Sequence, residues 1–277
     1  MTKIYQKALK HYLFLTGMSI LVLILVGIVI SSLFINQESL NPNLVFHLVP
    51  PSKEYPLGFG VNGINVFAWL VYGTKMSLFI SLIVCSISLT IGVFLGCVAG
   101  YFGNKIDALL MRIIDIILAF PGLLLAIYLS SIMKPSIFTL IFALSITGWV
   151  SYARLVRALV HEIKNRDYVT AAKALGASHT RIVFKHILPN ILSPILIQAS
   201  YGLSVIILAE SGLTFLGLGL PFGTPSLGSL LDQGVSNLFS ASYLAIFPGI
   251  LIALSVLAFN FIGDGLRDIL DPKSKIF

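Results

Sequence analysis

Charge is scarce in this sequence. Only 10% of its 277 residues are Asp, Glu, Lys or Arg, whereas 57% are hydrophobic. A soluble domain carries about 25% charged residues, so this composition excludes an ordinary soluble fold. We interpret the chain as an integral membrane protein, although its length alone would allow one or two soluble domains.

Motifs for catalysis and metal binding are also missing. The chain has no G-x-x-x-x-G-K-[ST] phosphate loop, no H-E-x-x-H, no C-x-x-C and no G-x-S-x-G. His161, His179 and His186 share one segment, but their spacing suits no common zinc site. Cys85 and Cys97 project from different sides of a helix, so we expect no disulfide between them. We therefore expect a chain that is not an enzyme and holds no metal or cofactor itself.

Six apolar segments are long enough to cross a membrane, which takes about 20 mostly apolar residues. They cover residues 12–34, 76–103, 116–133, 135–153, 187–220 and 243–263. The first follows three lysines, as a signal peptide would. It is longer than a usual signal core and lacks a small-residue cleavage site, so we expect a retained helix. The predicted fold class is an all-α integral membrane protein with six transmembrane helices.

The basic residues predict the orientation of these helices. A pI near 9.4 would also suit nucleic-acid binding, but that function needs a basic face on a soluble fold. Fifteen of the eighteen Lys and Arg residues fall in the tails and loops on one side of the six segments. Because Lys and Arg gather in cytoplasmic loops, we expect both termini in the cytoplasm and no nucleic-acid partner. Outer loops then cover about 35–75 and 221–242, and their Gly, Pro, Asn and Ser predict irregular structure.

One cytoplasmic segment, "DYVTAAKALGASHTRIVFKHILPN" at residues 167–190, is polar yet regularly patterned. Asp167 can cap a short helix that begins at the next residue, and Gly176 suits the left-handed residue that ends such a helix. Four residues at helical spacing form one apolar face of mostly small side chains. They are Tyr168, Ala171, Ala172 and Leu175.

A second helix is expected directly after this turn. Ser178 can cap it, and its apolar residues would be Ile182, Val183 and Ile187. Pro189 falls where the chain re-enters the membrane. The pattern predicts a helix–turn–helix unit at the cytoplasmic surface.

Two interpretations of this unit remain open from the pattern alone. An amphipathic helix can rest on anionic lipid at the membrane surface, or it can dock into a groove of another protein. Lipid insertion favours Leu, Phe and Trp, whereas alanines suit close backbone approach to a protein. We therefore favour docking.

The order Thr170-Ala171-Ala172, then Gly176, then Leu188-Pro189 resembles the "EAA" loop of ABC importer permeases. In that family the loop forms coupling helices that sit in a groove of the cytoplasmic ATPase. Thr170 stands where the family usually has glutamate, and His186 where isoleucine is frequent. The resemblance implies a coupling site made of Asp167, Tyr168, Thr170, Ala171, Ala172, Leu175, Gly176, Leu188 and Pro189.

Other stretches narrow the resemblance to one branch of the family. Residues 208–231 and 256–273 look like the C-type permease subunit of the dipeptide, oligopeptide and nickel importers. Residues 55–78 are similar to that branch's outer loop, usually G-T-D-x-x-G-R-D. Here residues 58–65 read G-F-G-V-N-G-I-N, without the two carboxylates and the arginine.

The resemblance implies a type I ABC importer permease fold, with both termini cytoplasmic, in the bacterial cytoplasmic (inner) membrane. Residues 1–75 would hold the N-terminal tail, the first helix and an outer loop. Residues 76–277 would form the core transmembrane domain, with the coupling loop at about 161–190.

The resemblance also implies partners. Such importers combine two permease subunits with two cytoplasmic ATP-binding subunits and an extracytoplasmic substrate-binding protein. A second homologous permease would form a heterodimer with this chain, and both would contact membrane lipid. ATP and Mg would be bound by the partner ATPase subunits. Di- and oligopeptides are the expected substrates of this branch, and nickel or a metal chelate is the alternative.

Glu210 is the one carboxylate well inside an apolar segment, where a charge costs about 2.5–3.5 kcal/mol on insertion scales. One interpretation places it on the transport path or gate, facing a cationic substrate group. The other, which we favour, is a structural acid, because the family resemblance places an acid here for varied substrates. A secondary transporter or channel is the alternative of a different class. It would need ionisable residues within the membrane, and only Glu210 is available.

Overall fold

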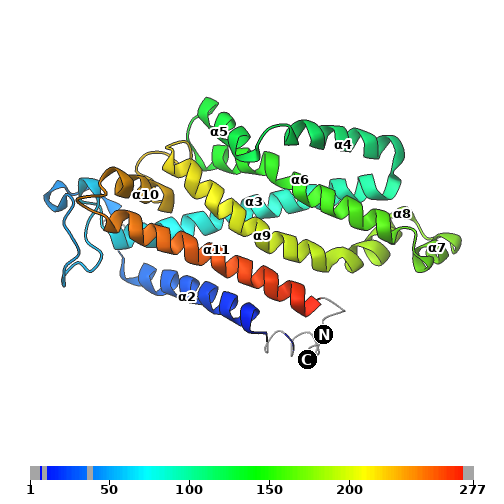
Figure 1. Ribbon diagram of the computed structural model, residues 1–277, viewed down its shortest axis with the longest axis horizontal. Helices are drawn as coiled ribbons and strands as arrows, with labels where there is room; N and C mark the ends of the chain where they lie inside the picture. Colours follow the sequence, from blue (N-terminus) through cyan, green and yellow to red (C-terminus); the bar gives the residue numbers. More distant parts are fainter. Residues whose placement is uncertain (1–6, 8–10, 36–39, 271–277) are drawn as a thin grey trace.

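The computed structural model describes residue 7 and residues 11–35 and 40–270. In this part of the chain, helices run along one long axis as a bundle (Figure 1). Five helical segments are long and apolar enough to cross a membrane. They are α2 (Tyr12–Phe34), α3 (Val66–Phe102), α6 (Ile137–Ile163), α9 (Leu188–Phe215) with the short segments before it, and α11 (Tyr243–Leu270). The all-α membrane fold is thus confirmed.

The predicted third span differs from the structure. Instead of one helix over 116–133, the chain forms α4 (Asn104–Leu118) and α5 (Gly122–Ile132), which together can count as one span bent by 75°. Pro121 precedes α5, and a proline lacks the N–H that a continuous helix would need there. A broken span therefore replaces the predicted straight helix.

The second span begins ten residues earlier than predicted. Asn65 caps α3, because its side-chain oxygen accepts the N–H of Ala68 at 3.1 Å. Lys75 lies inside this helix, although the prediction placed it in the outer loop. Its side chain is exposed, so the charge does not interrupt the helix.

The two predicted outer loops are only partly irregular. Residues 40–65 contain the short 3-10 turns η2 (Leu44–Phe46) and η3 (Val61–Gly63). The second loop, however, contains α10 (Leu227–Ser236), which the sequence analysis missed. Trp69 of α3 donates its indole N–H to the carbonyl oxygen of Ser226 at 3.2 Å, so α10 is tied to the bundle.

Helices α3 and α6 pack closely because glycines leave no side chain between them. Gly92, Gly96 and Gly100 follow one another at every fourth residue, on one face of α3. A Cβ atom added at these positions would lie 2.5, 2.7 and 2.8 Å from atoms of α6. Small residues at such spacing let two membrane helices approach backbone to backbone. The α3–α6 pair is the closely packed centre of the fold.

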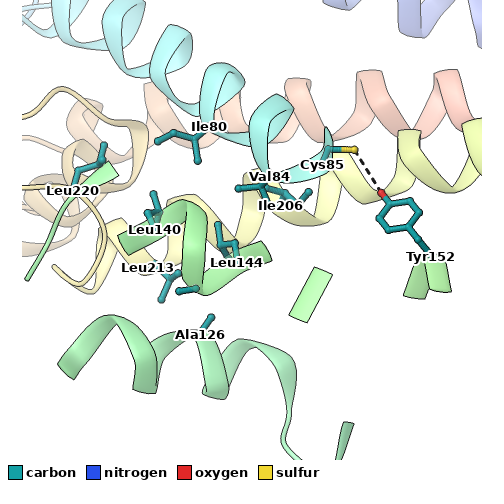
Figure 2. Packing of buried hydrophobic residues seen from close by; sticks show 11 residues of the cluster. Ile80, Val84, Cys85, Ala126, Leu140, Leu144, Tyr152, Ile206, Leu213 and Leu220 are labelled. Carbon is teal, nitrogen blue, oxygen red and sulfur yellow. Dashed lines mark hydrogen bonds between the residues drawn. The ribbon is translucent and has the colours of Figure 1, made fainter. Parts of the chain in front are cut away.

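An apolar cluster surrounds one part of this pair (Figure 2). Helices α3, α5, α6 and α9 all contribute to it. Its labelled members are Ile80, Val84, Cys85, Ala126, Leu140, Leu144, Tyr152, Ile206, Leu213 and Leu220. The dashed line in Figure 2 joins the Cys85 sulfur to the Tyr152 hydroxyl, 3.5 Å apart. Cys85 and Cys97 are both free thiols, so the expected absence of a disulfide is confirmed.

The two ends of the bundle carry different elements (Figure 1). The short helix α7 (Asp167–Ala174) lies at one end, which we call the loop end, and the start of α2 and the end of α11 are directed towards this end. Helix α10 and the segment at 40–65 lie at the opposite end. The segment at 167–190 therefore lies on the side towards which the first turn of α2 and the last turn of α11 are directed.

Candidate functional site

The segment at 161–190 forms the helix–turn–helix unit that its pattern predicts. Helix α6 ends at Ile163, and α7 follows after a short turn. The predicted cap is wrong by one residue, because Arg166 is the N-cap and Asp167 is the first helical residue. The Asp167 carboxylate still lies in the first turn, where it interacts favourably with the positive end of the helix dipole.

Gly176 ends α7 in the predicted left-handed conformation, with φ at +77°. Its N–H donates to the carbonyl oxygen of Lys173, and the N–H of Ala177 donates to that of Ala172, both at 3.0 Å. These two bonds make a complete Schellman motif. No atom lies within 4 Å of the position of an added Cβ, so only backbone conformation demands glycine here.

Helix α7 turns most of its predicted apolar face outward. Tyr168, Ala171 and Leu175 are exposed and Ala172 is half-buried, and 88% of Leu175 is accessible. The residue that anchors the helix is Val169, which is completely buried in a cluster with α3, α6 and α9. A large apolar side chain held in this exposed position on a fixed helix is suited to contact with another molecule.

The second half of the unit leads directly into α9. The Ser178 hydroxyl accepts the N–H of Arg181 at 3.4 Å and so caps α8 (His179–Arg181), as predicted. Ile182 and Ile187 are buried, and Val183 packs against the same cluster.

Between these helices, η4 (Ile182–Ile187) is a π-helical turn that the sequence analysis missed. The N–H of Leu188 donates to the carbonyl oxygen of Val183, five residues back. Leu188 is half-buried and Pro189 is exposed. Because Pro189 has no N–H, the regular bond to residue 185 is missing, and this proline is the sequence signal of the irregular turn.

Two polar contacts fix the unit to the bundle. The Tyr101 hydroxyl on α3 lies 2.8 Å from Nδ1 of His179. The Lys164 ammonium donates to the carbonyl oxygen of Gly100 on α3 at 2.8 Å. Outside the unit, Arg157 of α6 forms a bidentate ion pair with Asp107 of α4, in which Nη2 and Oδ2 are 2.6 Å apart. Such bidentate pairs are strong and geometrically specific. The unit is therefore bonded to α3, and α6, from which it continues, is bonded to α4.

Thr170 occupies the position at which the resemblance expects glutamate. Its side chain is exposed, and its hydroxyl donates to the carbonyl oxygen of Arg166 at 3.3 Å. The hydroxyl is therefore engaged with its own helix. This leaves no long polar side chain at this position of α7.

Glu210 lies on α9, and its side chain is completely buried. Ser77 of α3 donates its hydroxyl to Oε2 at 2.6 Å, and Ser211 donates to the same oxygen at 3.3 Å. The Thr214 hydroxyl is 3.2 Å from Oε1. Among the described residues no cation forms a salt bridge with this carboxylate. Three hydroxyl groups surround it, and the one from Ser77 connects α9 to α3.

The structure does not bring Glu210 and the helix–turn–helix unit together. They occupy opposite ends of α9, and 22 residues at 1.5 Å rise separate Glu210 from Leu188 by about 33 Å. In the part of the chain that the structure covers, no three His, Cys, Asp or Glu residues are grouped so that they could hold a metal ion. The candidate site thus has two separate parts. One is the exposed face of α7 at the loop end, and the other is the buried carboxylate of Glu210 towards the opposite end.

Comparison with known proteins identifies relatives over most of the chain. The family described as "binding-protein-dependent transport system inner membrane component" matches residues 92–276. The dipeptide transport system permease protein DppC of Bacillus subtilis (strain 168) is 38% identical over 97% of this chain and 84% of that protein. The oligopeptide transport system permease protein OppC of the same organism is 37% identical over 95% and 87%.

A further DppC, from Haemophilus influenzae, is 42% identical over 82% of this chain and 79% of that protein. Among solved structures, the inward-facing MetNI methionine ABC transporter resembles the fold with a TM-score of 0.60. The match covers 74% of this chain and 97% of that one at 21% identity. At this identity the likeness concerns the fold alone.

Proposed function

This chain belongs to the binding-protein-dependent transport system inner membrane components, and from this premise we propose that it is a transmembrane permease subunit for the ATP-driven import of di- and oligopeptides. Relatives at 37–42% identity are named as dipeptide and oligopeptide permeases. The observation that carries the mechanism is the apolar face of α7, exposed on a helix whose base is fixed. We place the coupling to ATP hydrolysis at this face.

The loop end faces the cytoplasm in this proposal. Fifteen of the eighteen Lys and Arg residues belong to the segments assigned to this side, as expected for cytoplasmic loops. The unit at 161–190 then meets two cytoplasmic ATPase subunits, which bind ATP and Mg. A second homologous permease and an extracytoplasmic binding protein complete the importer.

Coupling would begin at α7 and continue through buried contacts. Leu175, Ala171 and Tyr168 would fill a groove of the ATPase, as amphipathic helices do elsewhere. Movement of that groove would displace α7, which Val169 anchors among buried residues of α3, α6 and α9. Packed helices move as units rather than deform continuously, so the displacement would reach the membrane segments.

Helix α9 would carry this movement towards the outer side. It begins at Leu188, in the last residues of the unit, and contains the buried Glu210. The hydrogen bond from Ser77 to Glu210 joins α9 to α3, so both helices would move together in a rigid-body switch between inward- and outward-facing states. Glu210 is in this account a structural link and not a substrate contact.

Uptake in cells tests the peptide assignment. We expect a labelled dipeptide to accumulate only in cells that contain this chain together with its ATPase and binding-protein partners. A variant ATPase that binds but does not hydrolyse ATP should stop uptake. Accumulation of nickel or a metal chelate, without peptide, would move the assignment to the alternative substrate. Uptake that continues without ATP hydrolysis and ends when the proton gradient is dissipated would indicate a secondary transporter.

A further inference from the structure

An apolar groove of about 340 Å³ runs between α3 and the segment formed by α8 and η4. On one side it is lined by Leu89, Val93 and Phe94 of α3. Val183 and Phe184 of η4 line the other side. Exposed fractions of 66% for Phe94 and 67% for Phe184 show that no other described part of the chain covers these two rings.

The length and position of the groove match one leaflet of a membrane. Its α3 lining extends from Leu89 to Phe102, which corresponds to about 20 Å at 1.5 Å rise per residue. One leaflet with its headgroup region contributes about half of a bilayer of about 40–45 Å. The groove therefore begins at the loop end of α3 and extends as far as the acyl chains of that leaflet.

Titratable polar groups gather at the loop end of this groove, whereas the Thr90 hydroxyl at the other end donates to the carbonyl oxygen of Ser86. Tyr101 and His179 line the loop end and are hydrogen-bonded to each other. The ammonium group of Lys173 lies 5.5 Å from the centre of the Tyr101 ring. Next to Tyr101, the Lys164 ammonium donates to the carbonyl oxygen of Gly100 at 2.8 Å. Lys173 thus places a cation beside Tyr101, which lines this end of the groove.

Lys173 forms no salt bridge with a carboxylate of the described residues. Asp107 is paired with Arg157, and Glu162 with Arg166. Asp167 lies in the first turn of α7, where the helix dipole favours its charge. The loop end of the groove is therefore positive, and it complements an anionic group.

We propose that this groove is a binding site for one anionic phospholipid. An acyl chain lies along Leu89, Val93 and Phe184, and the phosphate group is held by Lys173 and His179. This groove combines an apolar lining, a length close to that of one leaflet and a cation at its loop end. Anionic lipids are attracted by basic residues at the membrane surface, and a transmembrane helix of another protein would require no such charge. The proposal is independent of the transported substrate.

The position of the site connects the lipid to the helix–turn–helix unit. One wall of the groove is η4, the π-helical turn between α8 and α9. A bound acyl chain would support this irregular turn against α3. Anionic lipid should consequently strengthen the coupling between the unit and α9, in addition to occupying the groove.

Native mass spectrometry of the assembled transporter tests the site. The complex is placed in nanodiscs of phosphatidylglycerol and phosphatidylcholine, and the lipids retained after release are counted. We expect one tightly held phosphatidylglycerol per copy of this chain.

Variants of the groove should change this binding. Val93→Trp should lose the bound phosphatidylglycerol, and Lys173→Gln should reduce the preference for phosphatidylglycerol about tenfold, which is 1.4 kcal/mol. Lys105→Gln, an exposed cation of α4 outside the groove, and Leu23→Trp, in the other apolar groove beside α2, should retain it.

A second measurement covers the case in which Val93→Trp does not fold. Phosphatidylglycerol with a photoreactive acyl chain is bound to the unmodified complex, irradiated and mapped by peptide mass spectrometry. Labelling of the peptide that contains Phe184, reduced by excess phosphatidylglycerol but not by phosphatidylcholine, is the expected result. Equal competition by both lipids would overturn the anionic specificity. Absence of label from this peptide would overturn the site.

Discussion

Small residues have opposite surroundings in two regions of the molecule: they are tightly packed between α3 and α6, and largely exposed on α7. Between α3 and α6, glycines at 92, 96 and 100 leave no space for even one added carbon atom. On α7 and its cap, Ala171, Ala174 and Leu175 are exposed, and nothing lies within 4 Å of an added Cβ at Gly176. Small residues in the first region complete the packing of this chain. In the second region they leave a surface for a partner, so substitutions there should spare the fold and impair function.

Substitution in the packed region should have the largest effect. Gly96→Leu would place a Cβ 2.7 Å from the carbonyl oxygen of Ala153, so the two helices would have to separate. Overpacking of this kind costs about 1–3 kcal/mol or more, and we expect the chain to lose most of its folded form in the membrane. Thermal unfolding and the amount of membrane-inserted protein measure this loss.

The matched control is Gly249→Leu on α11, where no atom lies within 4 Å of an added Cβ. It should leave the amount of protein and its melting temperature nearly unchanged. Equal damage by both variants would mean that glycine as such, rather than the α3–α6 contact, is needed in these helices.

On the exposed helix, Leu175→Asp should reduce peptide uptake more than tenfold while the chain remains folded and inserted. A carboxylate replaces the most exposed apolar side chain of α7, and its desolvation in a protein groove is costly. Uptake is compared with the amount of ATPase that co-purifies with the membrane subunits. Leu175→Met, of similar volume, serves as the control and should retain both. Normal uptake by Leu175→Asp would remove this face from the coupling mechanism.

A smaller effect is expected at the turn. Gly176→Val forces a β-branched residue into a left-handed conformation, which costs about 1–2 kcal/mol. No steric clash adds to this cost, so α7 should be displaced rather than the bundle unfolded. We expect normal assembly with a several-fold lower ratio of peptide transported to ATP hydrolysed. Gly176→Asn, which tolerates this conformation, should restore most of the ratio, whereas full uptake by Gly176→Val would contradict the account.

The smallest effect should follow from Glu210→Gln. Glutamine has the same shape; its amide oxygen can accept the Ser77 hydroxyl while its NH2 group faces the Thr214 oxygen. We therefore expect a melting temperature within a few degrees of the original. Relative uptake of different dipeptides should not change. If the variant alters substrate choice while assembly is intact, Glu210 belongs to the transport path instead of the structural link.

Features set by local backbone chemistry could be predicted from the sequence. Gly176 and Ser178 are recognisable because a left-handed turn and a helix cap require particular residue types over a few positions. The apolar face of α7 was recognisable from its spacing. Its exposure was not, because exposure depends on where α3, α6 and α9 hold Val169.

Features set by distant contacts could not be predicted in the same way. The spacing of Gly92, Gly96 and Gly100 is visible in the sequence, but it does not reveal that α6 is the partner. Likewise, Gly and Pro around α10 outweighed its helical pattern, and only the structure shows that Ser226 and Trp69 fix this helix to α3. Glu210 was identified as an isolated acid, whereas its partner Ser77 lies 133 residues earlier in the chain.

Site-specific cross-linking measures the central claim most directly, because it reports what covers the exposed face of α7. A photoreactive phenylalanine analogue is placed at Leu175 in the assembled transporter, and the same analogue at Phe239 of the opposite end serves as the control. The account predicts that position 175 captures an ATP-binding subunit and that position 239 does not. Cross-linking of position 175 only to lipid, with normal peptide uptake, would contradict it.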